Sequence, residues 1–404
     1  MSMRRGACPS LLQPMRTGDG LLARFSPAHG RLTPPRLKDI GMAAERFGNG
    51  LVEITSRGKL QIRGLTEERT PLLAARMAGL DLDISEGFQV ETGALSGLSA
   101  DAILDPEPLA ALIMRRVGEA GFIGKLGPKV SVTVDGGGPL HLAEIGADLK
   151  IEATCDGQWR LGIGGNGATA RWLGAGDAGS VADVCLAVLS VLAEEGPLAR
   201  ARQLTDEALG EFAAPLHAAA APARDHPSPV GTFALSDGSL AHGFALAFGQ
   251  ARGAELASFA GAAESAREIR LAPGGGLLVL GLAQDCYPVL RGAAERLGFI
   301  CDPEDPRLAI VACAGAPSCA AAHFNAKAVA RDVAASGLFD GAFRLHLSAC
   351  PKLCAAPAGG RVTLIGQETS CSLSTDGAAP AGDLLSLLTA RGETHRTVPC
   401  RKKC

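Results

Sequence analysis

The amino-acid sequence predicts an α+β fold built on an internal duplication. Two stretches of similar sequence lie far apart in the chain, and each shows the same predicted order of strands and helices. In addition, two cysteine pairs follow short predicted strands in the C-terminal part. A duplicated unit of this kind predicts two halves related by a pseudo-two-fold axis, with a cleft where the halves meet.

The duplication is visible in residues 19–45 and 237–264. The first stretch reads DGLLARFSPAHGRLTPPRLKDIGMAAE and the second reads DGSLAHGFALAFGQARGAELASFAGAAE, and the two align with one gap. Further on, ITSRGKLQIRGL (54–65) corresponds to LAPGGGLLVLGL (271–282). The chain therefore contains two copies of one structural unit.

Each copy is predicted to fold as strand, helix, strand, strand, helix. In the first copy Thr33 and Pro34 mark the start of a helix, because a threonine caps the free amide groups and proline is favoured in the first turn. Strands are predicted over 51–56 and 60–64, and Thr70 opens a second helix. This order is that of a ferredoxin-like half-domain.

The segment between the copies is predicted to be a separate α/β unit. It contains two apolar runs that read as strands (126–134 and 149–154) and a helical stretch (181–193). The following segment is rich in alanine and proline, which is typical of a linker. The predicted organisation is two ferredoxin-like half-domains (1–80 and 230–300), two α/β segments that bind a cluster or a tetrapyrrole (81–211 and 301–390), a linker (212–229) and a tail (391–404).

Composition excludes several classes of protein. A chain of 404 residues with 47% apolar and 20% charged residues can bury a sizeable core. The balance of 39 basic against 42 acidic residues gives a net charge of −3, which disfavours a nucleic-acid binder. No apolar run is long enough to cross a bilayer, and the N-terminus lacks the apolar stretch of a signal peptide. We therefore expect a cytoplasmic protein without a membrane partner.

The two cysteine pairs are the clearest chemical signal. Cys313 and Cys319 have five residues between them, and Cys350 and Cys354 have three. The pairs follow predicted strands over 308–312 and 343–348, so four thiols at two strand ends can converge on one point. Buried structural cysteines or a zinc site are alternatives, but zinc sites usually have shorter, compact spacings. The wider and unequal spacing favours a [4Fe–4S] cluster.

A helix is expected to start near Cys319 and to end at Gly337. Apolar residues within it are spaced to face a core, and glycine is the usual residue after a helix end. A thiol in the first turn of this helix would lie at the positive end of the helix dipole, which favours the thiolate form that binds metals.

A polar cationic face is predicted in the first copy only. Alternation at period two places four side chains on one face of the hairpin, and the second copy has glycine or leucine at the matching positions. The four are Arg57, Lys59, Gln61 and Arg63, against Gly274, Gly276, Leu278 and Leu280. The face is either a solvated strand surface or an anion site. Lys129, on another predicted strand, adds a cation and favours a site for carboxylates.

Taken together, the duplicated halves and the motifs C-x5-C and C-x3-C resemble the nitrite and sulfite reductase family over nearly the whole chain. The resemblance implies that one tetrapyrrole and one [4Fe–4S] cluster lie side by side. It implies that the four cysteines of the two pairs are the cluster ligands and that Cys354 faces the macrocycle.

The same resemblance implies roles for the cations. Arg57 and Gln61 match the family's T-x-R-x-x-x-Q hairpin, and Lys129 matches the first lysine of its proline-lysine strand. Together with Arg63, these residues are expected to bind tetrapyrrole carboxylates. The reductases have a second lysine where this chain has Ser131, and an Arg-Asn loop where residues 87–105 contain no cation. These differences disfavour reduction of sulfite or nitrite.

The opening stretch RRGACPSLLQPMRTGDGLLARF (4–25) is similar to the cobalamin-pathway branch of this family. That resemblance implies an oxygen-dependent monooxygenase of aerobic vitamin B12 biosynthesis, which converts precorrin-3A to precorrin-3B by hydroxylation at C20 and γ-lactone formation, using O2 and NADH. Alternatives are a sirohaem-dependent nitrite or sulfite reductase, and a non-catalytic protein that binds a metal or a cluster.

The same branch implies a mononuclear non-haem iron besides the [4Fe–4S] cluster. No 2-His-1-carboxylate spacing is visible, so its ligands stay open among the histidines at 29, 242, 323 and 346. No dinucleotide fingerprint follows a strand, so electrons from NADH are expected to arrive through a separate reductase. Cys400 and Cys404 lie in a tail without strand context and are expected to be exposed thiols.

Overall fold

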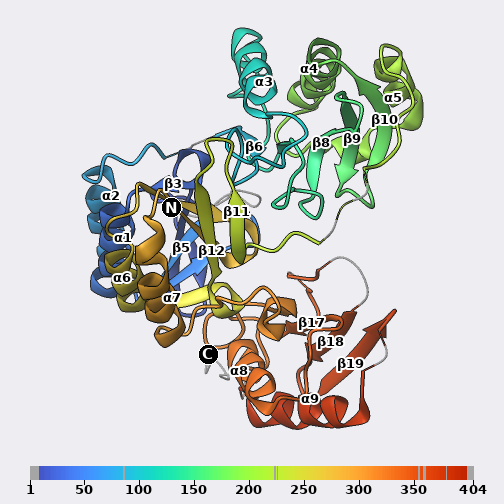
Figure 1. Ribbon diagram of the computed structural model, residues 1–404. Coiled ribbons are helices and arrows are strands. Elements are labelled where there is room, and N and C mark those ends of the chain that lie inside the picture. The colour runs from blue at the N-terminus through green and yellow to red at the C-terminus, as the bar shows by residue number, and fades with distance from the viewer. Residues whose placement is uncertain are drawn as a thin grey trace.

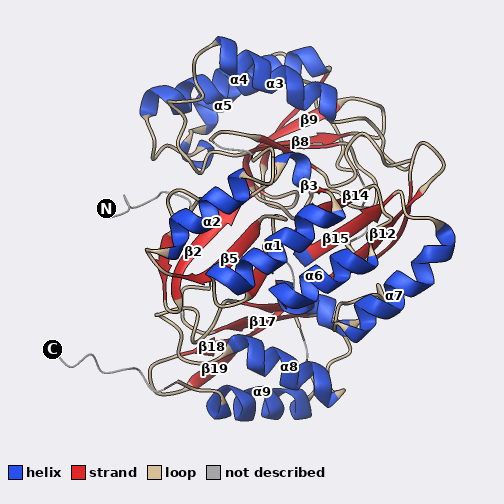
Figure 2. Cartoon of the chain, turned by 90° about the vertical axis from the view of Figure 1, so that its left-hand side faces the viewer, coloured by secondary structure: helices blue, strands red, loops and turns tan. Residues whose placement is uncertain are grey.

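The computed structural model describes residues 9–84, 87–222, 224, 226–353, 355–357, 361–378 and 380–397. Four sheets lie in this part of the chain, two from the repeated units in the centre and one from each α/β segment (Figure 1). The two α/β segments lie on opposite sides of the central sheets, and the two halves of the duplication meet between them (Figures 1 and 2).

The two central sheets exchange one strand each across the pseudo-two-fold axis. The first sheet has the order β1-β2-β5-β4-β13 and the second has the order β11-β12-β15-β14-β3. Strand β13 of the second copy pairs with β4 of the first, and β3 of the first copy pairs with β14 of the second. Each half therefore needs the other to complete its sheet.

The elements of the first copy are β1 (Met15–Thr17), β2 (Gly20–Phe25), β3 (Arg31–Leu32), α1 (Pro34–Phe47), β4 (Leu51–Ile54), β5 (Leu60–Leu65) and α2 (Arg69–Ala78). Those of the second copy are β11 (Gly231–Ala234), β12 (Leu240–Ala245), β13 (Gln250–Arg252), α6 (Gly253–Ala262), β14 (Glu268–Ala272), β15 (Gly276–Leu280) and α7 (Tyr287–Arg296).

The halves are joined by close packing of α1 against α6 (Figure 2). Gly41 in α1 and Gly253 at the start of α6 permit this approach: a methyl group on Gly41 would lie 2.4 Å from the carbonyl oxygen of Gly253. The apolar side of both central sheets packs on these helices, with Leu37, Ile40 and Phe259 in one core.

The third sheet, with the order β10-β9-β8-β7-β6, belongs to the segment between the copies. Its strands are β6 (Val90–Thr92), β7 (Val132–Asp135), β8 (Ala147–Ala153), β9 (Trp159–Gly165) and β10 (Arg171–Gly176). One face is apolar and packs on α3 (Glu107–Glu119), α4 (Ala178–Glu195) and α5 (Asp206–Ala213). The other face carries buried charges.

The fourth sheet has the order β16-β17-β18-β19, and Cys313 and Cys350 follow two of its strands. Its strands are β16 (Ile310–Ala312), β17 (Arg344–Ser348), β18 (Arg361–Gly366) and β19 (Cys371–Asp376), and α8 (Ala326–Ser336) and α9 (Gly382–Thr394) cover one face. Strands β16, β17 and β18 are parallel, so the carboxyl ends of β16 and β17 lie side by side at one end of the sheet, called the cysteine edge below.

The α+β prediction with two ferredoxin-like halves is confirmed, and so is the cap at Thr33, whose side chain accepts a hydrogen bond from the amide of Arg36. The predicted start of a helix near Cys319 is wrong. Helix α8 starts at Ala326, because the side chain of Asn325 caps it. Cys319 therefore does not lie in the first turn of a helix, and the dipole argument for its thiolate does not hold.

The strand predicted over 126–134 is also shorter than expected. Residues before Val132 form turns, and β7 covers only Val132–Asp135. Within the described part of the chain, the helices are all too short or too polar to cross a membrane.

Candidate functional site

A cavity of about 360 Å³ lies where the two halves meet the segment between them. Its wall includes the tip of the β4–β5 hairpin, the end of β14, the strand β6 and one side of α3. A volume of this size falls in the usual range for a small-molecule site. The cleft predicted between the halves thus corresponds to a real cavity.

The hairpin tip directs two cations into this cavity. Gly58 adopts a φ of +73°, which only glycine adopts easily, and the hydroxyl of Thr55 accepts hydrogen bonds from the amides of Arg57 (3.3 Å) and Lys59 (3.0 Å). This tight turn separates Arg57 and Lys59 by one residue, and both side chains line the cavity. The local sequence T-x-R-G-K therefore fixes the direction of both cations.

Glu91, from β6, faces these two cations. Its carboxylate lies 2.6 Å from Nη2 of Arg57 and 2.9 Å from Nζ of Lys59. Burial opposes ionisation of Glu91, but the charges of Arg57 and Lys59 outweigh it and lower the pKa of this carboxyl below its usual value. Nothing in the local sequence pattern indicated Glu91, since its partners lie in another unit of the chain.

A second carboxylate in the cavity wall pairs with a histidine instead. Glu107, at the start of α3, lies 3.5 Å from Nδ1 of His29 and accepts a hydrogen bond from the hydroxyl of Thr92. The hydrogen bond from His29 is the main reason that the pKa of Glu107 falls to about 2. Glu107 is thus ionised at neutral pH. It pairs with His29, whereas Arg57 and Lys59 pair with Glu91.

Gln61 and Arg63 continue the same strand face but do not line this cavity. Arg63 is only 3% exposed, and its guanidinium pairs with Asp19 and Glu53, each at 3.1 Å. Gln61 donates to Glu53 at 2.8 Å and accepts hydrogen bonds from Arg24. The predicted cationic face is therefore divided into an accessible part at the hairpin tip and a buried, neutralised part in β5.

Lys129 also lies outside the residues that line the cavity. It is exposed in the turn before β7, and its carbonyl oxygen accepts a hydrogen bond from Arg200 at 2.6 Å. Strands β6 and β7 are parallel, and their first residues, Val90 and Val132, are paired. Lys129, three residues before Val132, therefore lies at the end of the sheet where both strands begin. Its role in binding carboxylates stays a prediction.

The matching hairpin of the second copy has no cations at the positions that match Arg57 and Lys59, which are Gly274 and Gly276. Leu278 and Leu280 are buried in a small core with Phe233 and Leu95. At the hairpin tip, a methyl group on Gly276 would lie 2.4 Å from Cβ of Pro229, so that the chain itself fills the space. Leu271 and Pro273 of this copy lie in the wall of the larger cavity, but among its lining residues only the first copy's hairpin tip contributes cations, Arg57 and Lys59.

One cysteine of each pair, Cys313 and Cys350, lies at the carboxyl ends of neighbouring strands of the fourth sheet. Cys313 directly follows β16, and Cys350 follows the neighbouring parallel strand β17. The thiol of Cys313 accepts a hydrogen bond from the amide of Ala349 at 3.2 Å. Burial raises the pKa of the Cys313 thiol, and the amides of Ala349 and Gly315 partly oppose this effect.

The loop that carries Cys319 is held by the first half-domain. The carbonyl oxygen of Ser318 accepts hydrogen bonds from Nη2 of Arg63 (2.7 Å) and from the amide of Gly18 (3.1 Å). A side chain at Gly18 would collide with the backbone of this loop, since a methyl group there would lie 2.6 Å from the carbonyl oxygen of Pro317. Arg63 thus connects the first copy to the residue before Cys319.

The donor set suits a [4Fe–4S] cluster by its chemistry. Cys313 and Cys350 follow two neighbouring strands, Cys319 lies in the loop after Cys313, and the Cys313 thiol accepts a backbone hydrogen bond, as cluster sulfurs commonly do. Cys354, the fourth predicted ligand, lies outside the described residues, as do Cys400 and Cys404. Within the described residues no group of three His, Cys, Asp or Glu side chains is arranged to hold a metal.

The four candidate histidines for a second iron are dispersed. His29 pairs with Glu107, and His242 stacks on Tyr287 with 4.0 Å between the ring centroids. His323 lies beside the cysteine edge, where its amide donates to the carbonyl oxygen of Ala349 at 2.7 Å. His346 in β17 is fully buried, and neither of its ring nitrogens has a hydrogen-bond partner.

The burial of His346 gives a pH-dependent prediction. Burial, helped by the charge of Arg361, lowers the pKa of His346 to about 4. The unfolded chain binds a proton at this position near pH 6.5 while the folded chain does not, so stability falls as the pH decreases from about 6.5 to about 4. We expect His346→Leu to remove about 1–3 kcal/mol of this loss. Urea unfolding of both proteins at several pH values gives the free energy of unfolding as a function of pH. An equal dependence on pH in the two proteins would contradict the prediction.

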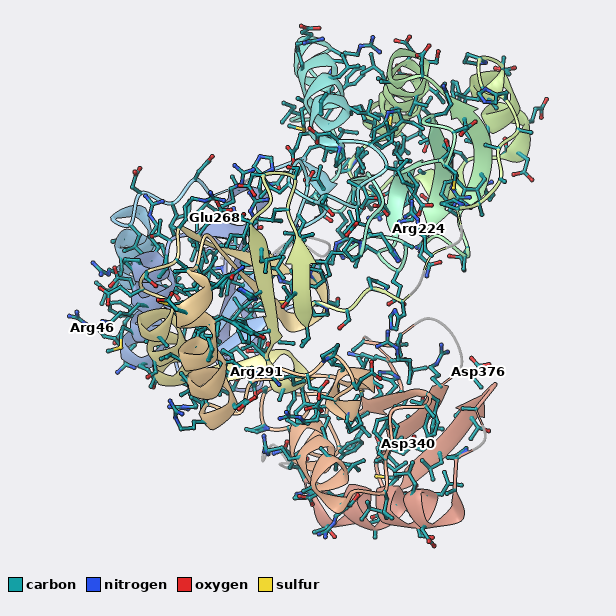
Figure 3. The ribbon with its side chains drawn as sticks, in the orientation of Figure 1. Arg46, Arg224, Glu268, Arg291, Asp340 and Asp376 are labelled. Atoms are coloured by element: carbon teal, nitrogen blue, oxygen red, sulfur yellow. The ribbon has the colours of Figure 1, made fainter. Side chains whose placement is uncertain are left out.

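The third sheet holds a charged network that the sequence pattern did not indicate. Lys150 is fully buried, donates to the carbonyl oxygen of Leu142 at 2.6 Å and lies 3.4 Å from Glu152. Glu152 pairs with Arg160 at 2.5 Å. Arg224, from the segment predicted as a linker, lies beside these strands and pairs with Asp135 (Figure 3). Three cations share the carboxylates of Glu152 and Asp135, and the pair of Arg224 with Asp135 ties that segment to the sheet.

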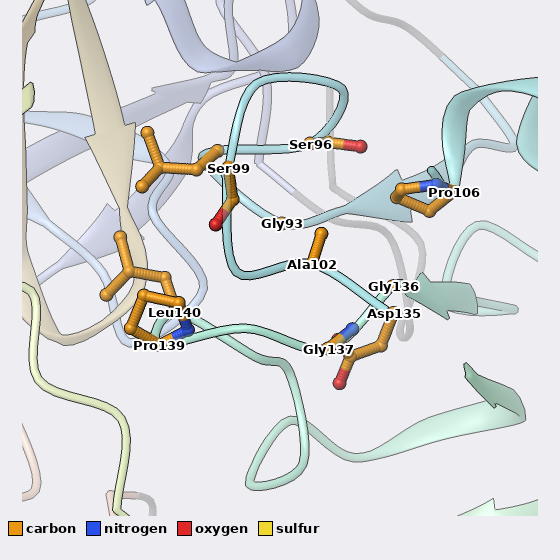
Figure 4. A pocket seen from close by; sticks show the side chains of 11 residues that line it. Gly93, Ser96, Ser99, Ala102, Pro106, Asp135, Gly136, Gly137, Pro139 and Leu140 are labelled. Carbon is orange, nitrogen blue, oxygen red and sulfur yellow. The ribbon is translucent and has the colours of Figure 1, made fainter. Parts of the chain in front are cut away.

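A second cavity, at the end of β7, is too small for a substrate. Its volume is about 20 Å³, and Ser96, Ser99 and Asp135 lie in its wall (Figure 4). A space of this size holds about one water molecule. The larger cavity is therefore the candidate binding site.

Comparisons with known proteins agree with this geometry. Residues 13–80 match the family described as the nitrite/sulfite reductase ferredoxin-like half domain. The chain is 38% identical over 386 residues to a precorrin-3B synthase from a Sinorhizobium species, with 94% of this chain and 84% of the relative covered. The structure of the Mycobacterium tuberculosis NirA protein has the same fold, with a TM-score of 0.71 and 21% identity, and the match covers 88% of this chain and 73% of that one. The resemblance read from the sequence is confirmed.

Proposed function

Since the chain belongs to the precorrin-3B synthase family, within the nitrite and sulfite reductase-like proteins, we propose that it is a monooxygenase of cobalamin biosynthesis. In this proposal it converts precorrin-3A to precorrin-3B by hydroxylating C20 and closing a γ-lactone, and it uses O2 and electrons from NADH. The similarity to a precorrin-3B synthase over 94% of the chain is the observation that carries the proposal.

The cavity at the hairpin tip supports a carboxylate-rich substrate. Arg57 and Lys59 point into it, and charge-assisted hydrogen bonds from such cations hold carboxylates well. A small oxyanion would meet a site in which Glu91 already pairs with both cations. A large molecule with several carboxylates can use these cations together with further contacts along its rim.

The cysteine edge supports the redox part of the proposal. Cys313, Cys319 and Cys350, with Cys354, would hold a [4Fe–4S] cluster, which supplies one-electron transfer that side chains cannot provide. A mononuclear non-haem iron is proposed in addition, with its ligands open. The electrons come from NADH through a separate reductase, because the sequence contains no dinucleotide fingerprint. The proposed location of both proteins is the cytoplasm.

The proposal is tested on anaerobically purified protein. Its absorption spectrum, iron and acid-labile sulfide are measured first, and precorrin-3A, ¹⁸O2 and a reducing system are then supplied. We expect a cluster spectrum without a sirohaem band, and a product that carries an oxygen atom derived from O2. A strong sirohaem band together with six-electron reduction of sulfite or nitrite would support the reductase alternative. Zinc without labile sulfide would support the non-catalytic one.

Replacing Arg57 tests its part in substrate binding. We expect Arg57→Ala to raise the Michaelis constant for precorrin-3A about tenfold, since a charge-assisted contact contributes about 1.5–3 kcal/mol. Iron and sulfide contents should stay unchanged, because Arg57 contacts Glu91 and Gly146 rather than the cysteine edge. Arg291→Ala, which removes an exposed arginine paired with Glu295 on α7, is the control. An unchanged Michaelis constant would remove Arg57 from the binding site.

A further inference from the structure

The ion pairs at the hairpin tip differ from the buried ones in the same half-domain. The side chains of Arg57 and Lys59 are each 31% exposed, and that of Glu91 is 21% exposed, whereas Arg63 is 3% exposed between its two carboxylates. The pairs of Glu91 therefore face the cavity and can exchange with a ligand, while those of Arg63 are sealed.

The charges at the tip are also unbalanced. Two cations, Arg57 and Lys59, share the single carboxylate of Glu91 among the ion pairs in the described part of the chain. The other carboxylate in the wall, Glu107, pairs with His29. Arg57, Lys59 and Glu91 together carry one net positive charge, which favours the approach of an anion to the hairpin tip.

Arg57 has a second contact that does not depend on Glu91. Its Nη1 donates to the carbonyl oxygen of Gly146 at 2.7 Å, and its own amide is fixed by Thr55 at 3.3 Å. If the carboxylate of Glu91 moves away, these bonds keep the guanidinium at the cavity. An incoming carboxylate would then find the groups that Glu91 contacts, Nε and Nη2 of Arg57 and Nζ of Lys59.

We propose that Glu91 is an internal carboxylate that occupies the anion site of Arg57 and Lys59 until a carboxylate of the ligand displaces it. For the identity of that ligand as a tetrapyrrole polycarboxylate, this inference rests on the proposed function. Glu91 lies in the segment 87–105, which contains three carboxylates and no cation. The segment thus lacks a substrate-binding charge and contributes an opposing one, so that small oxyanions compete poorly with it.

The experiment compares Glu91→Gln with the unaltered protein, each purified with its cofactors. Uroporphyrin III is the tetrapyrrole probe, measured by its fluorescence, and sulfite is the small anion, measured by calorimetry. Glutamine keeps the shape but not the charge, so we expect Glu91→Gln to bind uroporphyrin III about tenfold more tightly and to gain measurable sulfite binding. The double variant Arg57→Ala/Glu91→Gln should lose both gains.

Glu107→Gln is the matched control, because it removes the same charge from the same cavity wall but pairs with His29. Its effect on uroporphyrin III affinity should be clearly smaller. Equal or weaker binding by Glu91→Gln, or a gain as large in Glu107→Gln, would overturn the inference. Tighter binding without turnover of precorrin-3A would leave the inference standing and refute the proposed function. If the unaltered protein converts precorrin-3A but Glu91→Gln does not bind uroporphyrin III more tightly, the proposed function stands and the inference about Glu91 is refuted.

Discussion

Arg63→Met is expected to destabilise the protein by about 3–5 kcal/mol, because it leaves two carboxylates without their partner in a buried place. Arg63 is 3% exposed and lies 3.1 Å from both Asp19 and Glu53. These carboxylates raise the pKa of Arg63 against the effect of burial, and Arg63 in turn lowers the pKa of Asp19. Urea unfolding of the variant and the unaltered protein measures the loss.

The same substitution should also loosen the cysteine edge. Nη2 of Arg63 donates to the carbonyl oxygen of Ser318 at 2.7 Å, next to Cys319. We therefore expect less iron and labile sulfide per chain in Arg63→Met. The triple variant Arg63→Met/Asp19→Asn/Glu53→Gln removes the unpaired charges and should recover part of the stability, but not the contact with Ser318.

Arg16→Met is the control for Arg63, since it breaks an exposed ion pair with Glu67 in the same half-domain. Such surface pairs contribute less than about 1 kcal/mol. If Arg63→Met kept normal stability and iron content but bound the tetrapyrrole more weakly, Arg63 would belong to the carboxylate site that the family resemblance implies. The expected loss of stability and of iron would show instead that Arg63 holds the loop before Cys319 in place.

Cys313→Ala is expected to remove the iron and labile sulfide from the purified protein. Loss of groups that only support a ligand costs about 10–100-fold in metal affinity, so loss of a ligand should cost at least as much. Activity with precorrin-3A should disappear with the cluster, while circular dichroism should show that the fold persists.

Cys185→Ala is the control for Cys313. Cys185 is a fully buried thiol in α4, away from the fourth sheet, and burial raises its pKa well above the usual value. Its replacement should leave iron and sulfide unchanged. If Cys313→Ala retained both, or if the unaltered protein contained zinc without sulfide, the [4Fe–4S] assignment would fail.

The local features of the fold could be predicted because their causes are local. Thr33 and Pro34 mark the start of α1, because the Thr33 side chain accepts a hydrogen bond from a free amide and Pro34 has no amide hydrogen that would need a partner. The alternation of apolar and polar residues around Ile62 marks β5. The duplication needed only a comparison of the chain with itself. That Cys313 and Cys350 lie near each other also followed from the sequence, since they come one and two residues after strands that are parallel neighbours.

The helix expected near Cys319 shows where local signals fail. The run of alanines after this cysteine has high helix propensity, but Phe324 is fully buried and Asn325 caps α8 one residue later. The cap at Asn325 thus sets the start of α8 despite the helix propensity of the preceding alanines. Propensity could predict that α8 exists and ends at Gly337, but not where it begins.

The sequence by itself determined the family, the duplicated α+β fold, the cysteine pairs and the direction of Arg57 and Lys59 at a tight glycine turn. The tertiary structure decided which charges meet: Glu91 opposite Arg57, and Arg63 between Asp19, Glu53 and the loop before Cys319. Periodicity places a side chain on a face of its own strand, whereas its partner comes from a segment far away in the chain. The same strand face therefore carries two accessible cations, Arg57 and Lys59, at one end and the buried Arg63 at the other.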